Sequence, residues 1–348
     1  MPPDLPPPKR ILIVRLSALG DLVIATALLD GLRQAHPQAE IDWLVQPEFA
    51  PLLRSQQPEI AAIHLWERKT WGALFRGLRW LALWRAVRSF RDTLRARRYD
   101  WVIDAQGLAK SRLLAWLAGG AYRIGYTSKE PLAGLLHATV QRFPEGAAGR
   151  AAIGAEHAPM LAALTGREIG APRLRRPELP ANPPTLVLAP FTTRPQKHWP
   201  EAHWRTLIAA LLARGEALTL LGGPGDRAAA DRLLAGLPGG TVRDLVGRTK
   251  LPEALAWIAD ARAVIGVDTG LSHMAIACDR PAVVLFGSTL PYRGGSRAPL
   301  QVLWLGMSCS PCGRKPTCGG RFPCLVDISP PSVFAALDSV LKQELASP

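Results

Sequence analysis

The segment RILIVRLSALGDLVIATALLDGLRQ, residues 10–34, decides the fold of the first half of the chain. Residues 10–15 form a short, nearly continuous apolar run, which is typical of a strand buried on both faces of a sheet. A Ser-Ala-Leu-Gly-Asp turn follows, and residues 22–34 repeat their apolar positions with helical spacing. The order strand, glycine turn, helix predicts an α/β fold with a parallel sheet.

The alternation continues in two blocks, and a chain of 348 residues is too long for one ordinary core. Apolar runs predict strands at 41–45, 101–104, 185–189, 217–221, 263–267 and 282–286, and helical spacing predicts helices at 203–214, 228–235, 251–259 and 272–277. We therefore predict two Rossmann-like, doubly wound parallel-sheet domains. Their bounds are a flexible lead-in at 1–9, a first domain at 10–172, a proline-rich linker at 173–184, and a second domain at 185–348 with a cysteine-rich loop at 309–324 and a C-terminal helix.

Composition narrows the class of protein. The 42 Lys and Arg against 28 Asp and Glu give a formal charge of +14, which favours polyanionic partners such as nucleic acid, anionic lipid or a phosphorylated substrate. The proline-rich start has no apolar core of a signal peptide, and no later stretch is long and apolar enough to cross a membrane. We expect a cytoplasmic protein.

Residues 68–98 concentrate the arginines and interleave them with Trp71, Trp80, Trp84 and Phe90 at near-helical spacing. One interpretation is a basic amphipathic region suited to an anionic bilayer surface. The alternative is a pair of core-facing helices whose arginines are simply solvated.

Ligands of open α/β sheets bind beyond the carboxyl ends of the strands, so the turns there are the candidate site. After the first strand, Asp21 is a candidate general base or, alternatively, a helix N-cap. The loop at 190–200 gathers Thr192, Thr193 and Lys197, which suits a diphosphate, although a surface loop of a basic chain has the same composition. Asp226 follows two glycines and either accepts from sugar hydroxyls or caps its own turn.

The turn at 266–275 runs from a strand through Asp268, Thr269 and Gly270 into a helix. Backbone N–H groups at a helix start bind phosphate, so this turn predicts a phosphate site, with Asp268 on sugar hydroxyls and His273 as a donor. The alternative is that Ser272 and His273 merely pack on the sheet.

Taken together, five motifs resemble the lipopolysaccharide core heptosyltransferases of glycosyltransferase family 9, and within them the heptosyltransferase I type most closely. The motifs lie at residues 15–21, 104–111, 129–133, 192–200 and 267–273. The resemblance implies the GT-B architecture, in which two facing Rossmann-like domains enclose the active site in the cleft between them. It also implies inverting transfer of heptose from ADP-L-glycero-D-manno-heptose to 3-deoxy-manno-octulosonic acid (Kdo) on lipid A, with no cofactor required for catalysis.

The resemblance also implies residue roles. Asp21 is then the base and Lys197 the catalytic cation, while Thr192, Thr193 and the 269–273 turn serve the donor diphosphate. In the same way Asp268 orients the heptose and Asp226 contacts the ribose. Arg68, Lys69 and Lys129 fall where the family places cations that bind the acceptor. Because the acceptor sits in the inner leaflet, we expect a cytoplasmic protein peripherally attached to the anionic inner membrane.

Cys309, Cys312, Cys318 and Cys324 depart from the heptosyltransferase I pattern. Their spacing suits a structural zinc or iron ion, and free thiols in a packed loop are the alternative. Heptosyltransferase II or another nucleotide-sugar transferase, a UDP-sugar enzyme of the same fold, and a basic nucleic-acid-binding protein remain open. The last lacks any recognisable nucleic-acid-binding motif, so we expect no nucleic-acid partner.

Overall fold

The computed structural model describes residues 6–142, 152–167 and 170–346. The chain divides into two compact units, the first comprising residues 1–147 and 154–172 and the second residues 148–153 and 173–348. Residues 173–184, the expected linker, therefore cluster with the second unit. Most of the expected lead-in, residues 1–5, lies outside the described residues.

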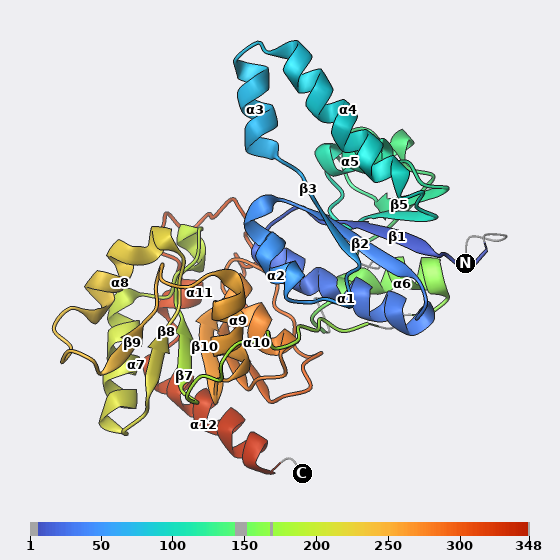
Figure 1. The fold of residues 1–348 in the computed structure, drawn as a ribbon. Helices are drawn as coiled ribbons and strands as arrows, with labels where there is room; N and C mark the ends of the chain where they lie inside the picture. The colour runs from blue at the N-terminus through green and yellow to red at the C-terminus, as the bar shows by residue number, and fades with distance from the viewer. Residues whose placement is uncertain (1–5, 143–151, 168–169, 347–348) are drawn as a thin grey trace. The chain divides into compact units, whose positions relative to one another are not determined.

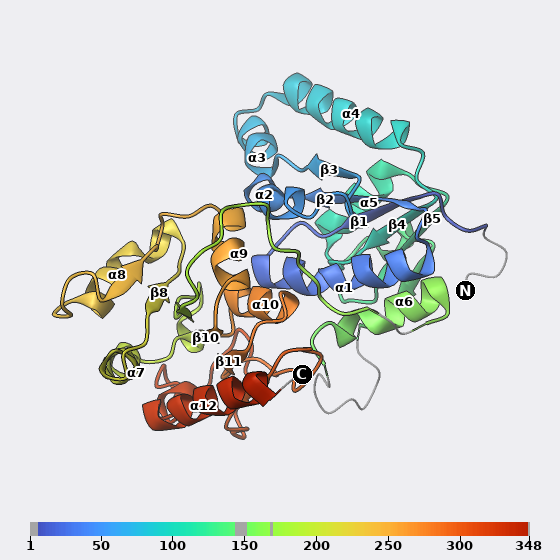
Figure 2. The same ribbon diagram turned by 60° about the horizontal axis from the view of Figure 1, so that its bottom comes forward.

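Unit 1 is built on a parallel sheet of six strands in the order β3-β2-β1-β4-β5-β6. Helices α1 and α6 cover one face of this sheet, and α4 and α5 cover the other (Figures 1 and 2). The strands are β1 (Arg10–Val14), β2 (Glu40–Val45), β3 (Ala62–Leu65), β4 (Trp101–Asp104), β5 (Tyr122–Tyr126) and β6 (Ala138–Val140). The helices are α1 (Leu19–Ala35), α2 (Ala50–Arg54), α3 (Arg68–Arg76), α4 (Trp80–Ala96), α5 (Ala109–Ala118) and α6 (Ala158–Thr165).

Unit 2 repeats the design with a parallel sheet in the order β12-β11-β10-β7-β8-β9. Helix α12 packs beside β11 and β12 and against α7 (Figure 2). The strands are β7 (Leu186–Ala189), β8 (Leu218–Leu220), β9 (Val242–Asp244), β10 (Ala263–Val267), β11 (Ala282–Leu285) and β12 (Leu300–Leu303). The helices are α7 (Glu201–Ala213), α8 (Arg227–Leu234), α9 (Leu251–Ala259), α10 (Gly270–Ala277), α11 (Pro323–Val326) and α12 (Pro330–Ala346).

Counted from its own first strand, each sheet has the order 3-2-1-4-5-6, which is the Rossmann topology. The predicted α/β class with two doubly wound parallel sheets is confirmed. In such sheets the strand order reverses between the first and fourth strands, here β1 and β4 in unit 1 and β7 and β10 in unit 2. Ligands bind at the carboxyl ends of that strand pair, so each unit has one expected crevice.

The cores explain why the sequence forms these sheets. Residues Ile11 to Val14 of β1 are fully buried, as a central parallel strand with helices on both faces requires. In unit 2 the same holds for Leu186 to Ala189 of β7. No helix within the described residues is long and apolar enough to span a bilayer.

Candidate active site

At the crevice of unit 1, the loop after β1 is hydrogen-bonded to the loop after β4. The Leu16 N–H donates to Gln106 Oε1 at 3.0 Å, and Arg15 Nη1 donates to the Ala105 carbonyl at 2.8 Å. Asp104, at the end of β4, accepts 3.0 Å bonds from the N–H groups of Gln106 and Gly107. Burial raises the pKa of Asp104, although these hydrogen bonds oppose the shift. The loops after β1 and β4 therefore form one hydrogen-bonded frame.

Asp21 projects from this frame. Its Oδ2 lies 2.6 Å from Arg15 Nη2, and the side chains are 54% and 6% exposed respectively. Burial lowers the pKa of Arg15, and the charge of Asp21 opposes that shift. The interpretation of Asp21 as a helix N-cap is wrong, because α1 begins at Leu19, its N-cap is Ala18, and Asp21 lies in the first turn. An accessible carboxylate on a buried guanidinium can reach a substrate hydroxyl.

Cations surround the same crevice, and sequence reasoning found only part of them. Desolvation lowers the pKa of the half-buried Lys110, and the charges of Arg68 and then Arg15 lower it further, so both guanidinium groups lie within electrostatic range of its ammonium group. Arg142 lies 4.5 Å from the Tyr126 ring centroid and donates to the Gln106 carbonyl at 3.2 Å. This cluster of Arg15, Arg68, Lys110 and Arg142, which we call the unit 1 cation cluster, suits an anionic substrate.

Among the predicted acceptor residues, Arg68 joins this cluster through its effect on Lys110. Lys69 and Lys129 are exposed on the surface of unit 1. Lys110 was missed as a site residue although it lies in a motif that the sequence had singled out. Its position could have indicated a site residue, because it lies in the first turn of α5, directly after the loop that follows β4.

In unit 2 the structure brings together three predicted site residues. Lys197 Nζ contacts Asp268 Oδ2 and lies 3.4 Å from the Asp268 carbonyl oxygen. His273 Nε2 lies 3.2 Å from Asp268 Oδ1. The contact follows from topology, because Lys197 is in the loop after β7, Asp268 directly follows β10, and these strands are neighbours.

Two residues that sequence reasoning missed complete this arrangement. The Thr289 hydroxyl donates to Asp268 Oδ2, and the Tyr292 hydroxyl lies 3.0 Å from His273 Nδ1. Both follow β11 in a loop with no periodic pattern. Burial would raise the pKa of Asp268, but hydrogen bonds and charges from His273 and then Lys197 outweigh it and hold the pKa well below its usual range. Asp268 is therefore a fixed anion that positions a cation and an imidazole.

The turn into α10 is tightly built. Thr269 is the N-cap and Gly270 the first helical residue. Ser272 Oγ donates to the Val267 carbonyl at 2.6 Å, so the interpretation that Ser272 is structural is confirmed. A Cβ on Gly266 would lie 2.3 Å from Ser272 Oγ, which explains a glycine at that point of the strand. His273 does not simply pack on the sheet, since its ring faces Asp268 and Tyr292.

The remaining donor candidates occupy two loops. Thr192 is half-buried and Thr193 exposed in the loop after β7. Asp226 Oδ2 accepts from the Gly223 N–H at 2.8 Å, so the turn contact that the sequence allowed for Asp226 is present. A Cβ on Gly222 would lie 2.6 Å from the Phe191 ring, so this glycine accommodates Phe191.

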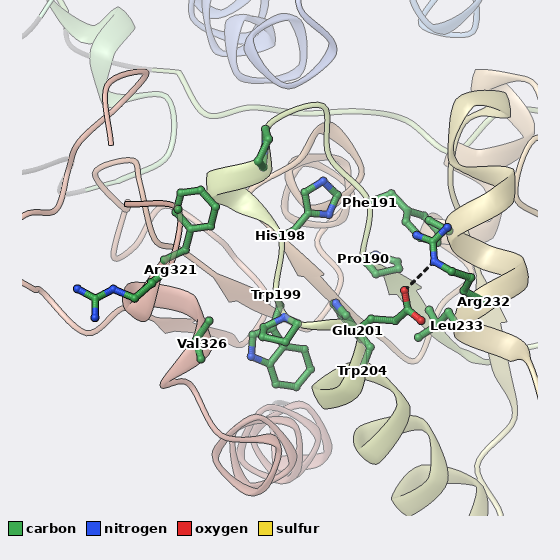
Figure 3. A pocket seen from close by; sticks show the side chains of 15 residues that line it. Pro190, Phe191, His198, Trp199, Glu201, Trp204, Arg232, Leu233, Arg321 and Val326 are labelled. Carbon is green, nitrogen blue, oxygen red and sulfur yellow. Dashed lines mark hydrogen bonds and ion pairs between the residues drawn. The ribbon is translucent and has the colours of Figure 1, made fainter. Parts of the chain in front are cut away.

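A cavity of about 350 Å³ lies beside the loop after β7 (Figure 3). Phe191, His198, Trp204 and Phe322 line it, and Glu201 pairs with Arg232 at 3.2 Å across one side. Its lining includes none of the predicted donor residues of this unit. The cavity therefore does not coincide with the predicted donor residues.

The cysteine-rich loop belongs to unit 2. Burial raises the pKa of the Cys324 thiol, and the neighbouring thiols of Cys312, Cys309 and Cys318 raise it further. All four cysteines are free of disulfides. Within the described residues, no three His, Cys, Asp or Glu side chains are arranged to hold a metal ion. The thiols are close enough to interact electrostatically but are not in ligating geometry.

Comparison with known proteins identifies the family. The sequence pattern of Glycosyltransferase family 9 (heptosyltransferase) matches residues 87–320. Lipopolysaccharide heptosyltransferase 1 of Pseudomonas aeruginosa is 35% identical, with 89% of this chain and 87% of the relative covered. The chain belongs to glycosyltransferase family 9, the heptosyltransferases. The predicted family and the prediction of a glycosyltransferase are confirmed.

Other members of family 9 agree. Lipopolysaccharide heptosyltransferase 2 of Escherichia coli K12 is 28% identical, with 97% of this chain and 100% of the relative covered. The solved structure of E. coli heptosyltransferase WaaC with ADP-2-deoxy-2-fluoro heptose matches with a TM-score of 0.72 and 27% identity, covering 95% of this chain and 99% of that one. This heptosyltransferase therefore has the two α/β domains of the GT-B architecture and uses a nucleotide-sugar donor. Family membership favours the transferase over the nucleic-acid-binding alternative.

Proposed function

We propose that this heptosyltransferase transfers heptose from ADP-L-glycero-D-manno-heptose to Kdo on lipid A in the assembly of the lipopolysaccharide inner core. The observation that carries the proposal is a carboxylate paired with a cation at each switch point, the place where the strand order of a sheet reverses. The pairs are Asp21 with Arg15 and Asp268 with Lys197. One carboxylate is accessible and suits a base, and the other fixes a cation that suits a departing diphosphate.

The reaction has two sides. Asp21 takes the proton of an acceptor hydroxyl while that oxygen forms a bond to the anomeric carbon of the heptose. The bond from this carbon to the ADP oxygen breaks, and ADP leaves with the electron pair. Attack from the face opposite the leaving group inverts the anomeric configuration. The departing charge requires stabilising groups that are already in position.

Unit 2 supplies those groups in this proposal. Lys197 carries the charge, and it is preorganised because Asp268 and the Asp268 carbonyl hold its ammonium group. The N-terminus of α10 at Thr269 and Gly270 offers backbone N–H groups to a phosphate. The remaining assignments follow the family: Thr192, Thr193 and His273 on the diphosphate, Asp268 on the heptose and Asp226 on the ribose.

Unit 1 binds the acceptor. Kdo is an acidic sugar, and the unit 1 cation cluster supplies positive charge beside Asp21. Arg68 and Lys110 are its exposed and half-exposed members, and Lys69 and Lys129 extend the positive surface. We place the enzyme on the cytoplasmic side of the inner membrane, peripherally attached, because its acceptor is a lipid.

Mass spectrometry tests the function directly. Pure protein is incubated with ADP-heptose and Kdo-lipid A, and the product is expected to gain one heptose. A parallel reaction with an acceptor that already carries the first heptose tests the heptosyltransferase II alternative, to which the 28% identical relative points. Product only in that second reaction, or only with a UDP sugar, would show that the assignment is wrong.

We further propose that the four clustered cysteines, Cys309, Cys312, Cys318 and Cys324, hold a structural zinc or iron ion, with no part in the reaction. Thiolates are suitable ligands for both metals, and the effect of Cys312, Cys309 and Cys318 on Cys324 supports their proximity. Within the described residues they are not arranged as ligands, so the ion would have to draw them together. Elemental analysis of purified protein, combined with thiol titration before and after unfolding, tests this. A protein with four reactive thiols and no bound metal would contradict it.

A further inference from the structure

Helices α3 and α4 form a hairpin whose outer end stands away from the sheet of unit 1 (Figure 1). Its base is anchored in the core, because Trp71, Val87 and Phe90 pack against buried residues. The Trp71 ring contacts the rings of Trp66 and Phe90, with centroids 6.4 and 5.2 Å away. The base therefore fixes the direction in which the rest of the hairpin projects.

The outer end of the hairpin, which we call the hairpin tip, consists of Phe75, Leu78, Trp80, Leu81 and Trp84. These side chains are 57, 70, 53, 60 and 54% exposed. The described part of the chain has twelve exposed large hydrophobic side chains, and five of them lie in these ten residues. Exposed apolar residues scattered singly need no explanation, but a contiguous group marks an interaction site.

The backbone conformation of Leu78 is a second unusual feature of the hairpin tip. Leu78 has a φ of +53°, in the left-handed region where glycine is favoured over a side chain. Its side chain gains no burial in the protein that would offset this strain. The turn is nevertheless well defined, since the Leu78 N–H donates to the Phe75 carbonyl at 3.1 Å. Nothing within the described residues therefore explains a leucine at this point.

The charge around the tip selects the partner. Residues 68–98 contain ten Lys and Arg and one acidic residue, Asp92. Arg76, Arg79 and Arg85 are exposed beside the tip, and the guanidinium of Arg88 lies 5.2 Å from the Trp84 ring centroid. Tryptophan rings favour the bilayer interface, and arginine binds phosphate with two parallel hydrogen bonds. A second copy of this chain would bring the same positive charge to the contact and would be repelled.

We propose that the hairpin tip inserts into an anionic lipid bilayer, with its apolar side chains below the headgroups and the flanking arginines on lipid phosphates. The inference deepens the proposed function, on whose lipid-anchored acceptor it rests. Helix α3 begins at Arg68 of the unit 1 cation cluster and ends at the tip. At 1.5 Å per residue, its nine residues separate Arg68 from the tip by about 14 Å. The tip would thus hold the crevice at a fixed height above the lipid surface.

Vesicle binding tests the inference without donor or acceptor. Wild-type protein is floated with vesicles of phosphatidylglycerol and phosphatidylethanolamine, and with vesicles of phosphatidylcholine alone. We expect binding to the anionic vesicles that weakens as salt is raised. The triple variant Leu78→Gly, Trp80→Ser, Trp84→Ser should bind about tenfold or more weakly, because it removes the inserted apolar area. Leu345→Ser, which changes an 87% exposed leucine elsewhere, is the matched control and should bind like the wild type.

Stability and turnover separate the outcomes. The Leu78→Gly variant alone relieves backbone strain, so weaker binding with an unchanged or higher melting temperature cannot be attributed to unfolding. Tip variants should transfer heptose normally to a Kdo acceptor without acyl chains. If that reaction fails in the wild type while vesicle binding behaves as expected, the proposed function fails and the membrane contact stands. Equal vesicle binding by wild type and triple variant, or a tip that changes only the oligomeric state, would overturn the inference.

Discussion

The two units share one strand order and both place an aspartate beside a cation at the switch point, yet they expose these pairs differently. In unit 1 the Asp21 side chain is 54% exposed and rests on a buried Arg15. In unit 2 Asp268 is only 9% exposed and Lys197 is 14% exposed. The accessible carboxylate can be reached by a substrate from solvent, whereas the buried one holds a cation in position. The same fold thus supplies a base in one unit and an anchored positive charge in the other.

Chain position explains this difference. Asp268 immediately follows Val267 of β10, so its carboxylate remains among the buried loops at the sheet edge. Asp21 comes after a longer loop, on the first turn of α1, where the helix carries it beyond that edge. In this chain the carboxylate directly after its strand is thus buried, and the one further from its strand is accessible.

Loss of the accessible carboxylate should have the largest effect. Asp21→Asn keeps the shape of the side chain but cannot accept a proton, so we expect kcat to fall by about 10²- to 10⁴-fold. Donor affinity, measured by calorimetry with ADP, should be nearly unchanged because Asp21 serves the acceptor. Glu201→Gln alters the first-turn acid of α7 instead and should retain turnover. Near-normal kcat in Asp21→Asn would place the base elsewhere.

Removing the anchored cation should have the next largest effect. Lys197→Met should lower kcat/KM by about 100-fold and weaken ADP binding, because charge on the leaving diphosphate loses its partner. Lys197→Arg should recover little, since a planar guanidinium cannot take the place of an ammonium held by Asp268 and its carbonyl. Steady-state kinetics with both variants test this. Unaltered donor binding in Lys197→Met would contradict the phosphate role.

Part of the fold could be predicted from the sequence. Strands β1, β4, β7 and β10 were predictable because central parallel strands are continuous apolar runs. Strands β3, β5, β6, β9 and β12 were not predicted, since they are short or mix polar and apolar residues. The basic segment at 68–98 is two helices whose inner face packs on the core, as the core-facing interpretation expected. The bilayer-surface interpretation of its exposed outer end stays a prediction.

Sequence reasoning found those site residues that sit in strand-to-helix turns. Lys197, Asp268 and His273 belong to such turns, and the fold brings them into contact. Thr289 and Tyr292 could not be found that way, because their loop after β11 has no helix start and their contacts with Asp268 and His273 span about twenty residues of chain. The contacts are observed, but every assigned role stays a prediction. This holds for Asp21, Arg68, Lys69, Lys129, Thr192, Thr193, Lys197, Asp226, Asp268, Thr269, Gly270 and His273.

Removing one cation of the unit 1 cation cluster should have a smaller effect, which is on the KM for the acceptor. Lys110→Met should raise the KM for the Kdo acceptor by about tenfold, because a charged hydrogen bond contributes about 1.5–3 kcal/mol and neighbouring cations share the substrate. The KM for ADP-heptose should not change. Lys129→Met, at an exposed position, should raise the acceptor KM less. Equal effects of the two variants would show that the cluster acts only as diffuse positive charge.

The smallest expected effect is a change in the pH dependence of stability. It can be compared between the two units, because each has a buried aspartate with a lowered pKa. In unit 2, His273 and Lys197 hold the pKa of Asp268 below its ordinary value of 3.8 against the effect of burial. In unit 1, burial would likewise raise the pKa of Asp42, but hydrogen bonds from His64, Arg97 and Tyr99 lower it below its ordinary value. A carboxyl with a lowered folded-state pKa stabilises the fold above its unfolded-state pKa, and this contribution is lost as the pH falls toward the folded-state value.

Melting temperatures of wild type, Asp268→Asn and Asp42→Asn should therefore differ most near neutral pH, by about 2–4 °C for each kcal/mol lost. Below about pH 4 the differences should narrow, because the wild-type carboxyls then begin to lose their advantage over the unfolded state. Because each aspartate belongs to its own unit, the double variant should combine the two losses additively. A difference that stays constant between neutral and acid pH would mean that the aspartates contribute shape and packing but not charge. That result would leave Asp268 unable to fix Lys197 electrostatically, and the contrast between a reactive and an anchored carboxylate would lose its physical basis.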